Sequence, residues 1–178
     1  MVELVGIYNL CVMKWSEAKR YMKDFKTNVM RMLDKAKVPY NHYSYVDTDA
    51  ISGLDVAKVL NQDPAKVFKT LVTLAKSGNH YVFLVPVESE LDLKKAAISV
   101  NEKSIEMLKT KELLPLTGYI HGGCSPIGMK KFFKTVIDSS AKNFDTIIFS
   151  AGKIGYQVEL TLENLKNVIN FELFDIRV

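Results

Sequence analysis

Lys69 is the residue whose type and surroundings point most directly to chemistry. It lies in the run Val67 to Leu74, which is rich in apolar and β-branched residues and is therefore expected to form a strand. Alternate residues of a strand point to opposite faces, and both faces of this strand are largely apolar. A lysine there either extends its ammonium along an apolar wall to water or lies at the edge of a cleft, where a ligand can reach it.

Two glycine-rich segments offer a second kind of chemistry. They are Thr117–Gly128 and Ser150–Gln157, and each follows an expected strand. Glycine allows the backbone to approach a ligand closely and to point N–H groups at it, which suits a carbonyl oxygen, a carboxylate or a phosphate. The alternative is that both segments are simply tight turns between strands.

Cys124 and His121 could form a nucleophile and its base. Three residues of separation in a loop fix no geometry, however, and no third group that would orient the base is evident, so this interpretation is disfavoured. The remaining histidines, His42 and His80, are scattered along the chain without carboxylates spaced to complete a metal site. We therefore predict neither a metal nor a cofactor.

The composition is that of an ordinary soluble domain. The 178 residues include 24 Lys+Arg and 20 Asp+Glu, which gives a net charge of +4, and 48% are hydrophobic. This charge permits a polyanionic partner without requiring one. Five lysines could contact phosphates or simply form a solvated face: Lys94, Lys95, Lys130, Lys131 and Lys134.

Cysteine spacing and hydropathy exclude two further classes of protein. Cys11 and Cys124 are the only cysteines and lie far apart, so neither a disulfide framework nor a zinc ribbon is expected. The longest apolar stretch, Val5–Met13, is about half the ~20 residues that a membrane span requires. We expect a cytoplasmic protein with no membrane segment.

Short helices and strands must position these groups. The patterns predict helices at Thr27–Lys37, Ser52–Asn61 (with Ser52 as N-cap), Asp92–Ile98, Ser104–Leu108 and Thr161–Ile169. They predict strands at His42–Val46, Val67–Leu74, Tyr81–Val87, Tyr119–Ile120, Lys134–Asp138, Thr146–Ser150, Gln157–Leu160 and Phe171–Ile176. The second and third of these strands form the clearest hairpin. The fold class is mixed α/β, and the short strands and the absence of Gly-x-Gly-x-x-Gly disfavour a Rossmann domain.

Several of these segments together resemble the YbaK/EbsC family of aminoacyl-tRNA deacylases, which is similar to the editing domain of bacterial prolyl-tRNA synthetases. The matching pieces occur in order: Val67–Leu71, Val85–Val87 with Glu90–Lys94, Thr117–Gly128, Ile137–Asp138 and Ser150–Gly155. The resemblance extends from about Asn28 to Ile176. It places a YbaK-like deacylase domain at residues 25–178 and leaves residues 1–24 as an N-terminal extension of unknown role.

The resemblance implies a curved, barrel-like mixed sheet surrounded by short helices. It also implies hydrolysis of the ester between a mischarged amino acid and tRNA, typically cysteine on tRNA for proline. Lys69 resembles the family's functional lysine, which contacts either the tRNA 3′ end or the aminoacyl group, and by this resemblance it is the expected catalytic residue. The other residues that the resemblance assigns to substrate binding are Tyr45, Thr70, Gly122, Gly123, Ser150, Gly152 and Gln157.

An aminoacyl ester is already activated, so such an enzyme mainly positions it and stabilises the developing oxyanion. In cysteine-specific members the substrate's own thiol is thought to attack its carbonyl. One departure is visible, because relatives commonly have an aspartate where this chain has Gln157, and an amide cannot pair with an ammonium as a carboxylate does.

Two alternatives remain open. One is an Ala-tRNA(Pro) deacylase of the same superfamily. The other is a non-catalytic module that binds tRNA or a synthetase. The expected partners are an aminoacyl-tRNA, specifically tRNA for proline, and, by the resemblance, prolyl-tRNA synthetase.

Overall fold

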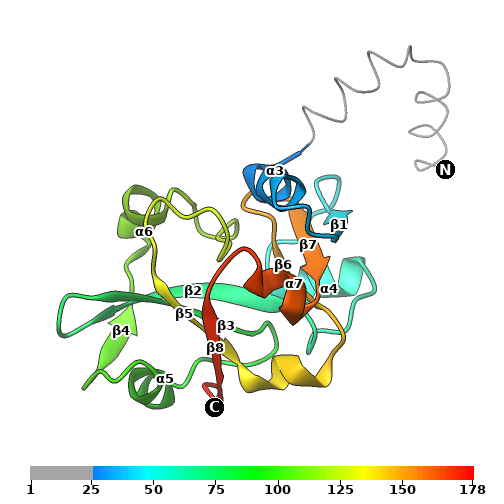
Figure 1. Cartoon of the computed structure of the whole chain (residues 1–178). Coiled ribbons are helices and arrows are strands. Elements are labelled where there is room, and N and C mark those ends of the chain that lie inside the picture. The colour runs from blue at the N-terminus through cyan, green and yellow to red at the C-terminus, as the bar shows by residue number, and fades with distance from the viewer. Residues whose placement is uncertain (1–25) are drawn as a thin grey trace, which may run out of the picture.

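The strands divide into two sheets in the computed structural model, which describes residues 26–178 (Figure 1). The predicted extension, residues 1–24, lies outside the described residues. The smaller sheet has the order β1-β7-β6 and the larger the order β4-β2-β3-β5-β8. The strands are β1 (Asn41–Ser44), β2 (Phe68–Ala75), β3 (His80–Pro86), β4 (Ile105–Met107), β5 (Lys134–Asp138), β6 (Ile147–Ser150), β7 (Tyr156–Leu160) and β8 (Phe171–Phe174).

The hairpin of β2 and β3 forms the centre of the larger sheet and confirms the clearest sequence prediction. Its antiparallel register runs from Phe68 opposite Pro86 to Leu74 opposite His80. Gly78 makes the turn with a φ of 90°, a conformation that glycine adopts without steric cost. β5 pairs with β3 in parallel and β8 with β5 in parallel, so the sheet is mixed.

The two sheets meet where β2 begins. Val67 forms a parallel bridge with Ile148, and the Lys66 carbonyl accepts a hydrogen bond of 3.0 Å from the Ile148 amide. The mixed α/β class is confirmed, while the strands of residues 26–178 form two joined sheets rather than one closed barrel. This junction places the start of β2 beside the ends of β6 and β7.

Five short α-helices and one 3-10 helix surround the sheets in the described part of the chain. They are α3 (Asn28–Lys35), α4 (Gly53–Val59), α5 (Leu93–Ser99), α6 (Thr110–Thr117), α7 (Leu162–Lys166) and η1 (Ser139–Asn143). Ser52 caps α4 in a reciprocal capping box with Asp55, and Thr161 caps α7, as the sequence predicts. These caps satisfy backbone N–H groups that a helix start otherwise leaves unpaired.

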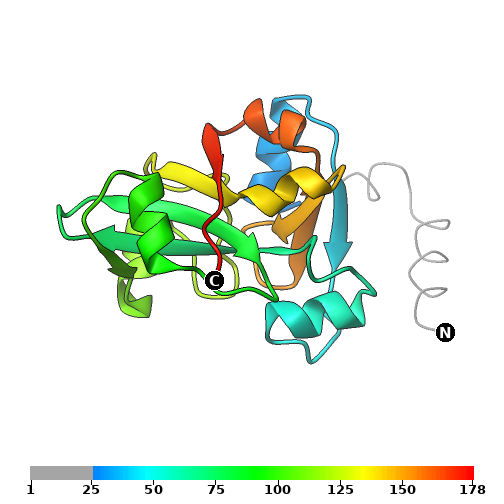
Figure 2. The ribbon, with the colours of Figure 1, turned by 90° about the horizontal axis from the view of Figure 1, so that it is seen from below.

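The larger sheet has a core on each face. On one face, Met30 and Leu33 of α3 belong to the same buried cluster as Phe68 and Val72 of β2. On the other face lies α5, as Figure 2 shows from below, and its buried alanines pack in a cluster with Phe83. Apolar burial on both faces explains why the β2 and β3 sequences are apolar almost throughout.

Two sequence predictions are wrong. Ser104–Leu108 is not a helix, because Ile105–Met107 forms the edge strand β4 against Thr73–Ala75 of β2. Tyr119–Ile120 is not a strand, because Gly118 ends α6 in the left-handed conformation and the chain continues as a loop. Tyr119 instead anchors that loop by donating its hydroxyl to the Ile127 carbonyl.

Candidate active site

A cavity of about 470 Å³ opens along the first half of β2. β4 pairs with β2 only from Thr73 onward, so among the described residues this stretch of the strand has no neighbour in the sheet on that side. Its other walls come from the start of α4, the segment from the end of β4 to the first turn of α6, the segment from His121 to Cys124, the end of β6 and the start of β7. The junction of the two sheets therefore creates the cavity.

The cavity brings together most of the predicted site residues, although they are distant in the sequence. Those on its wall are Tyr45, Lys69, Thr70, Gly122, Ser150 and Gln157. Gly123 and Gly152 are not among the residues that line the cavity. A Cβ atom on Gly123 would lie 3.2 Å from the Ile154 amide nitrogen, and one on Gly152 would lie 2.9 Å from the Tyr119 ring. These glycines allow the two loops to pack closely.

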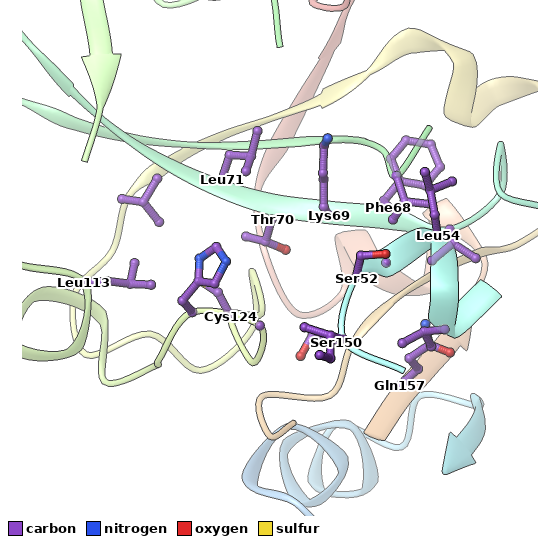
Figure 3. A pocket seen from close by; sticks show the side chains of 18 of the residues that line it. Ser52, Leu54, Phe68, Lys69, Thr70, Leu71, Leu113, Cys124, Ser150 and Gln157 are labelled. Atoms are coloured by element: carbon purple, nitrogen blue, oxygen red, sulfur yellow. The ribbon is translucent and has the colours of Figure 1, made fainter. Parts of the chain in front are cut away.

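Lys69 lies at the rim of the cavity. Its Nζ is 2.9 Å from Glu90 Oε1, and the two side chains are 28% and 80% exposed. Lys69 and Thr70 leave β2 in opposite directions, with Thr70 on the side of Cys124 and Ser150 (Figure 3). The ammonium is thus directed toward the rim, away from the part of the cavity bordered by Thr70, Cys124, Ser150 and Gln157, which we term the inner recess.

The Thr70 side chain lines the cavity, and its hydroxyl is buried. Its Oγ1 has no hydrogen-bond partner among the described residues. Leaving a buried polar group unpaired costs about 1–3 kcal/mol, so a structural role does not explain this threonine. A ligand that accepts or donates a hydrogen bond in the recess would remove that cost.

Cys124 is poorly suited to act as a nucleophile. The side chain is 8% exposed, and burial raises the pKa of its thiol to about 12. The thiolate is the reactive form, so this thiol is unreactive near neutral pH. His121 also lines the cavity but is exposed, and no hydrogen bond joins it to Cys124.

Gln157 closes the floor of the inner recess. It is 5% exposed, and its Oε1 accepts a hydrogen bond of 3.0 Å from Gln62 Nε2. Among residues 26–178, Glu90 at the rim is the one acidic side chain on the cavity wall. The recess therefore contains neutral polar groups and no carboxylate.

Glu159 follows Gln157 on the same face of β7 and belongs to a different environment. Its carboxylate accepts hydrogen bonds from the side chains of Lys66, Thr146, Tyr43 and Asn41, a set that we term the Glu159 network. Burial by itself raises the pKa of Glu159, but the bonds from Lys66, Thr146 and Tyr43 outweigh it and hold the pKa at about 2. The hydrogen bond to Glu159 also raises the pKa of the Tyr43 phenol to about 12.

Sequence patterns did not reveal three residues that matter here. Glu90 was noted only as the first residue of a segment that resembles the family, and no motif pointed to Gln62 or Glu159. Contacts across 95 and 93 residues, Gln62 to Gln157 and Lys66 to Glu159, reveal their roles, and no local pattern encodes such pairs.

The basic lysines that could contact phosphates lie outside the cavity. None of the five lysines of the basic set lines the cavity, and Lys95 and Lys134 are paired with Asp175 and Glu172. Within residues 26–178, no group of three or more His, Cys, Asp and Glu side chains is arranged to hold a metal ion. The same residues include no helix with the length and hydropathy of a membrane span.

Comparisons with known proteins agree with this arrangement. The model of the aminoacyl-tRNA editing domain matches residues 49–168, which include all of the residues that line the cavity except Tyr45. The chain is 44% identical over 152 residues to "Putative Cys-tRNA(Pro)/Cys-tRNA(Cys) deacylase EbsC" of Enterococcus faecalis, covering 85% of this chain and 93% of the relative. It is 25% identical over 126 residues to the uncharacterized protein YwhH of Bacillus subtilis, covering 70% and 79% of the two chains.

A solved structure supports the fold. The crystal structure of "a putative trans-editing enzyme for prolyl tRNA synthetase" superposes with a TM-score of 0.71 at 19% identity, covering 85% of this chain and 98% of that one. At this identity the likeness concerns the fold alone. The editing-domain match over more than half of the chain, together with the 44% identical relative, establishes the relationship: this chain belongs to the aminoacyl-tRNA editing domain family.

Proposed function

We propose that this chain is an aminoacyl-tRNA deacylase that removes cysteine from tRNA for proline in trans. Family membership and the name of the 44% identical relative support this substrate class. The observation that carries the proposal is the inner recess, where the unpaired Thr70 hydroxyl and the backbone of the two glycine loops surround a space without a reactive protein nucleophile.

Hydrolysis of an aminoacyl ester requires little more than this recess offers. The ester is intrinsically reactive, so the protein has to orient it and to stabilise charge on the carbonyl oxygen as the tetrahedral intermediate forms. A single well-placed donor contributes about 3 kcal/mol to such stabilisation. We assign this role to the Thr70 hydroxyl, together with backbone N–H groups near Gly122.

The attacking atom then comes from the substrate. We propose that the cysteine thiol attacks its own carbonyl, so that a carbon–sulfur bond forms, the ester carbon–oxygen bond breaks, and the thiol proton passes to the departing ribose oxygen. The cyclic thioester released would hydrolyse in water. Because Cys124 is protonated and enclosed, it does not compete for the carbonyl.

Lys69 fits the tRNA better than the reacting carbonyl. Its ammonium is directed toward the rim and forms an ion pair with the Glu90 carboxylate. A phosphate of the tRNA 3′ end can displace that exposed carboxylate at little cost, because exposed ion pairs contribute only about 0–1 kcal/mol. We therefore assign Lys69 to substrate positioning at the mouth of the cavity.

The choice of tRNA and of partner is less constrained. The structural neighbour named as a trans-editing enzyme for prolyl-tRNA synthetase makes that synthetase the first partner to test. Docking onto a synthetase would supply tRNA selection, which a small cavity for an aminoacyl group does not provide by itself.

A panel of mischarged tRNAs tests the proposal. The purified full chain is mixed with tRNA(Pro) carrying cysteine, serine or alanine, and release of each amino acid is followed over time. We expect cysteine release to exceed serine release by about a hundredfold, since serine replaces only the attacking sulfur. Equal serine release would rule out attack by the thiol, faster alanine release would establish the alanine-specific alternative, and binding without release would indicate a non-catalytic module.

A further inference from the structure

We propose that Gln62 is a positioning residue that fixes the orientation of the Gln157 amide, so that the floor of the inner recess offers a hydrogen-bond donor and not an acceptor. This inference rests on the proposed function, because it names the group that the recess recognises. It assigns the floor to an oxygen of the substrate, namely the ester carbonyl that becomes the oxyanion, and not to the α-ammonium.

The direction of one hydrogen bond carries the inference. Gln62 Nε2 donates to Gln157 Oε1 at 3.0 Å, which occupies the oxygen end of the Gln157 amide. An amide has an acceptor end and a donor end, so engaging the oxygen leaves the NH₂ group for the cavity. In Figure 3 the nitrogen of Gln157 lies on the side of Ser52, another residue of the cavity wall.

The segment that carries Gln62 is held firmly. The Gln62 amide donates to the Ala57 carbonyl at 2.8 Å, and four residues later the Lys66 carbonyl accepts from Ile148 of β6. Lys66 also pairs with Glu159, so one turn contacts two successive same-face residues of β7. Because the segment from Gln62 to Lys66 is held at both ends, the Gln62 side chain can keep the Gln157 amide in one orientation.

Stability does not account for this pair of amides. The Oε1 atom of Gln62 is buried and has no hydrogen-bond partner among the described residues, which costs about 1–3 kcal/mol. A leucine or methionine pair at these positions would avoid that cost. The Gln157 amide would give this side of the recess a neutral donor for an oxygen, the kind of group that stabilises an oxyanion.

Two charged substitutions of Gln62 separate the effect of hydrogen-bond direction from the effect of packing. Gln62→Lys retains a donor toward Gln157 Oε1. Gln62→Glu supplies an acceptor, which would bind Gln157 Nε2 and turn the amide oxygen into the recess. With cysteinyl-tRNA(Pro) as substrate, we expect kcat of Gln62→Glu to fall about tenfold or more below that of Gln62→Lys, with KM values within about threefold of each other.

If Gln62 had only a structural role, both variants would lose the same free energy of unfolding in urea and the same fraction of kcat. Equal kcat values, or a higher kcat in Gln62→Glu, would overturn the inference. The wild-type protein is assayed in the same series, so a failure of the proposed function is seen separately as an absence of cysteine release. In that case the side-chain amide resonances of Gln157, recorded by NMR, still decide: they should shift in Gln62→Glu more than in Gln62→Lys, and identical shifts would refute the inference.

Discussion

Gln157 and Glu159 are neighbours on one face of β7 and lie in opposite kinds of environment. The Glu159 carboxylate is charged, buried and bonded by four side chains. Around Gln157 the polar groups are neutral, and two of them, Thr70 Oγ1 and Gln62 Oε1, have no partner among the described residues. Along β7, a carboxylate whose hydrogen bonds are made therefore lies two residues away from a region where polar atoms lack hydrogen-bond partners.

The difference distinguishes structural from functional polar groups. A buried charge is tolerated only when its hydrogen bonds are complete, and it then holds elements together, here β1, the turn before β2 that contains Lys66, and β7. A neutral polar group left incomplete costs less and keeps a bond available for a ligand. We therefore expect substitutions in the Glu159 network to change stability and substitutions of the neutral polar groups of the inner recess to change catalysis.

The largest effect should come from Glu159→Gln. The amide cannot pair with the Lys66 ammonium, which is only 28% exposed, and it cannot accept all of the bonds that the carboxylate accepts. We expect the free energy of unfolding in urea to fall by about 3 kcal/mol. The kcat of the folded fraction should be unchanged, so a stable variant that has lost its activity would contradict the division between the two regions.

Acid should weaken the same network without any substitution. The pKa of Glu159 is about 2 in the folded protein and near its ordinary value of about 4.3 when unfolded. The folded value is the lower one, so the stabilisation is complete above about pH 4.3 and is lost as the pH falls toward 2, amounting to about 3 kcal/mol. Urea unfolding between pH 6 and 2.5 measures this loss, and Glu159→Gln should show a smaller decline over that range.

Thr70→Val should have the opposite signature. Valine has nearly the same shape but lacks the unpaired hydroxyl, so the free energy of unfolding should stay constant or rise by about 1 kcal/mol. Deacylation should fall by about 10- to 100-fold in kcat. A loss of stability with normal kcat would show that Thr70 has a structural role instead.

Cys124→Ala should have small effects on both activity and stability. The thiol is buried and its pKa is raised to about 12, so removing it takes away no reactive group. We expect kcat within about threefold of wild type and a stability loss of about 1 kcal/mol from the smaller side chain. Inactivation by alkylation of the folded protein at pH 7.5, absent in Cys124→Ala, would argue that the thiol is accessible and reactive after all.

Local patterns predicted much of the fold and only part of the site. The β2–β3 hairpin and the Ser52 and Thr161 caps were predictable because their signals are contiguous in sequence. α6 was missed because Lys109 provides no side-chain cap and Pro115 interrupts the helical pattern. The three residues of β4 were mistaken for a helix because so short an edge strand depends on its partner, β2.

The site shows the same limit. Strand alternation places Lys69 and Thr70 on opposite faces, yet only the structure shows that a cavity at the open edge of β2 is bordered by both. The contact between Gln62 and Gln157 joins residues 95 positions apart and has no sequence signal. What could be predicted were the residue types in the recess, and what could not were their hydrogen-bond partners.

The most direct test of the proposed activity compares wild type with Lys69→Ala in the release of cysteine from cysteinyl-tRNA(Pro). Lys69 is partly exposed, and its ion pair within residues 26–178 is with a largely exposed carboxylate, so the variant should keep its unfolding free energy within about 1 kcal/mol. We predict rapid release by wild type and a loss of at least about a hundredfold in kcat/KM for the folded variant. Wild-type release no faster than in buffer, or full activity in Lys69→Ala, would contradict the assignment of this cavity as the deacylation site.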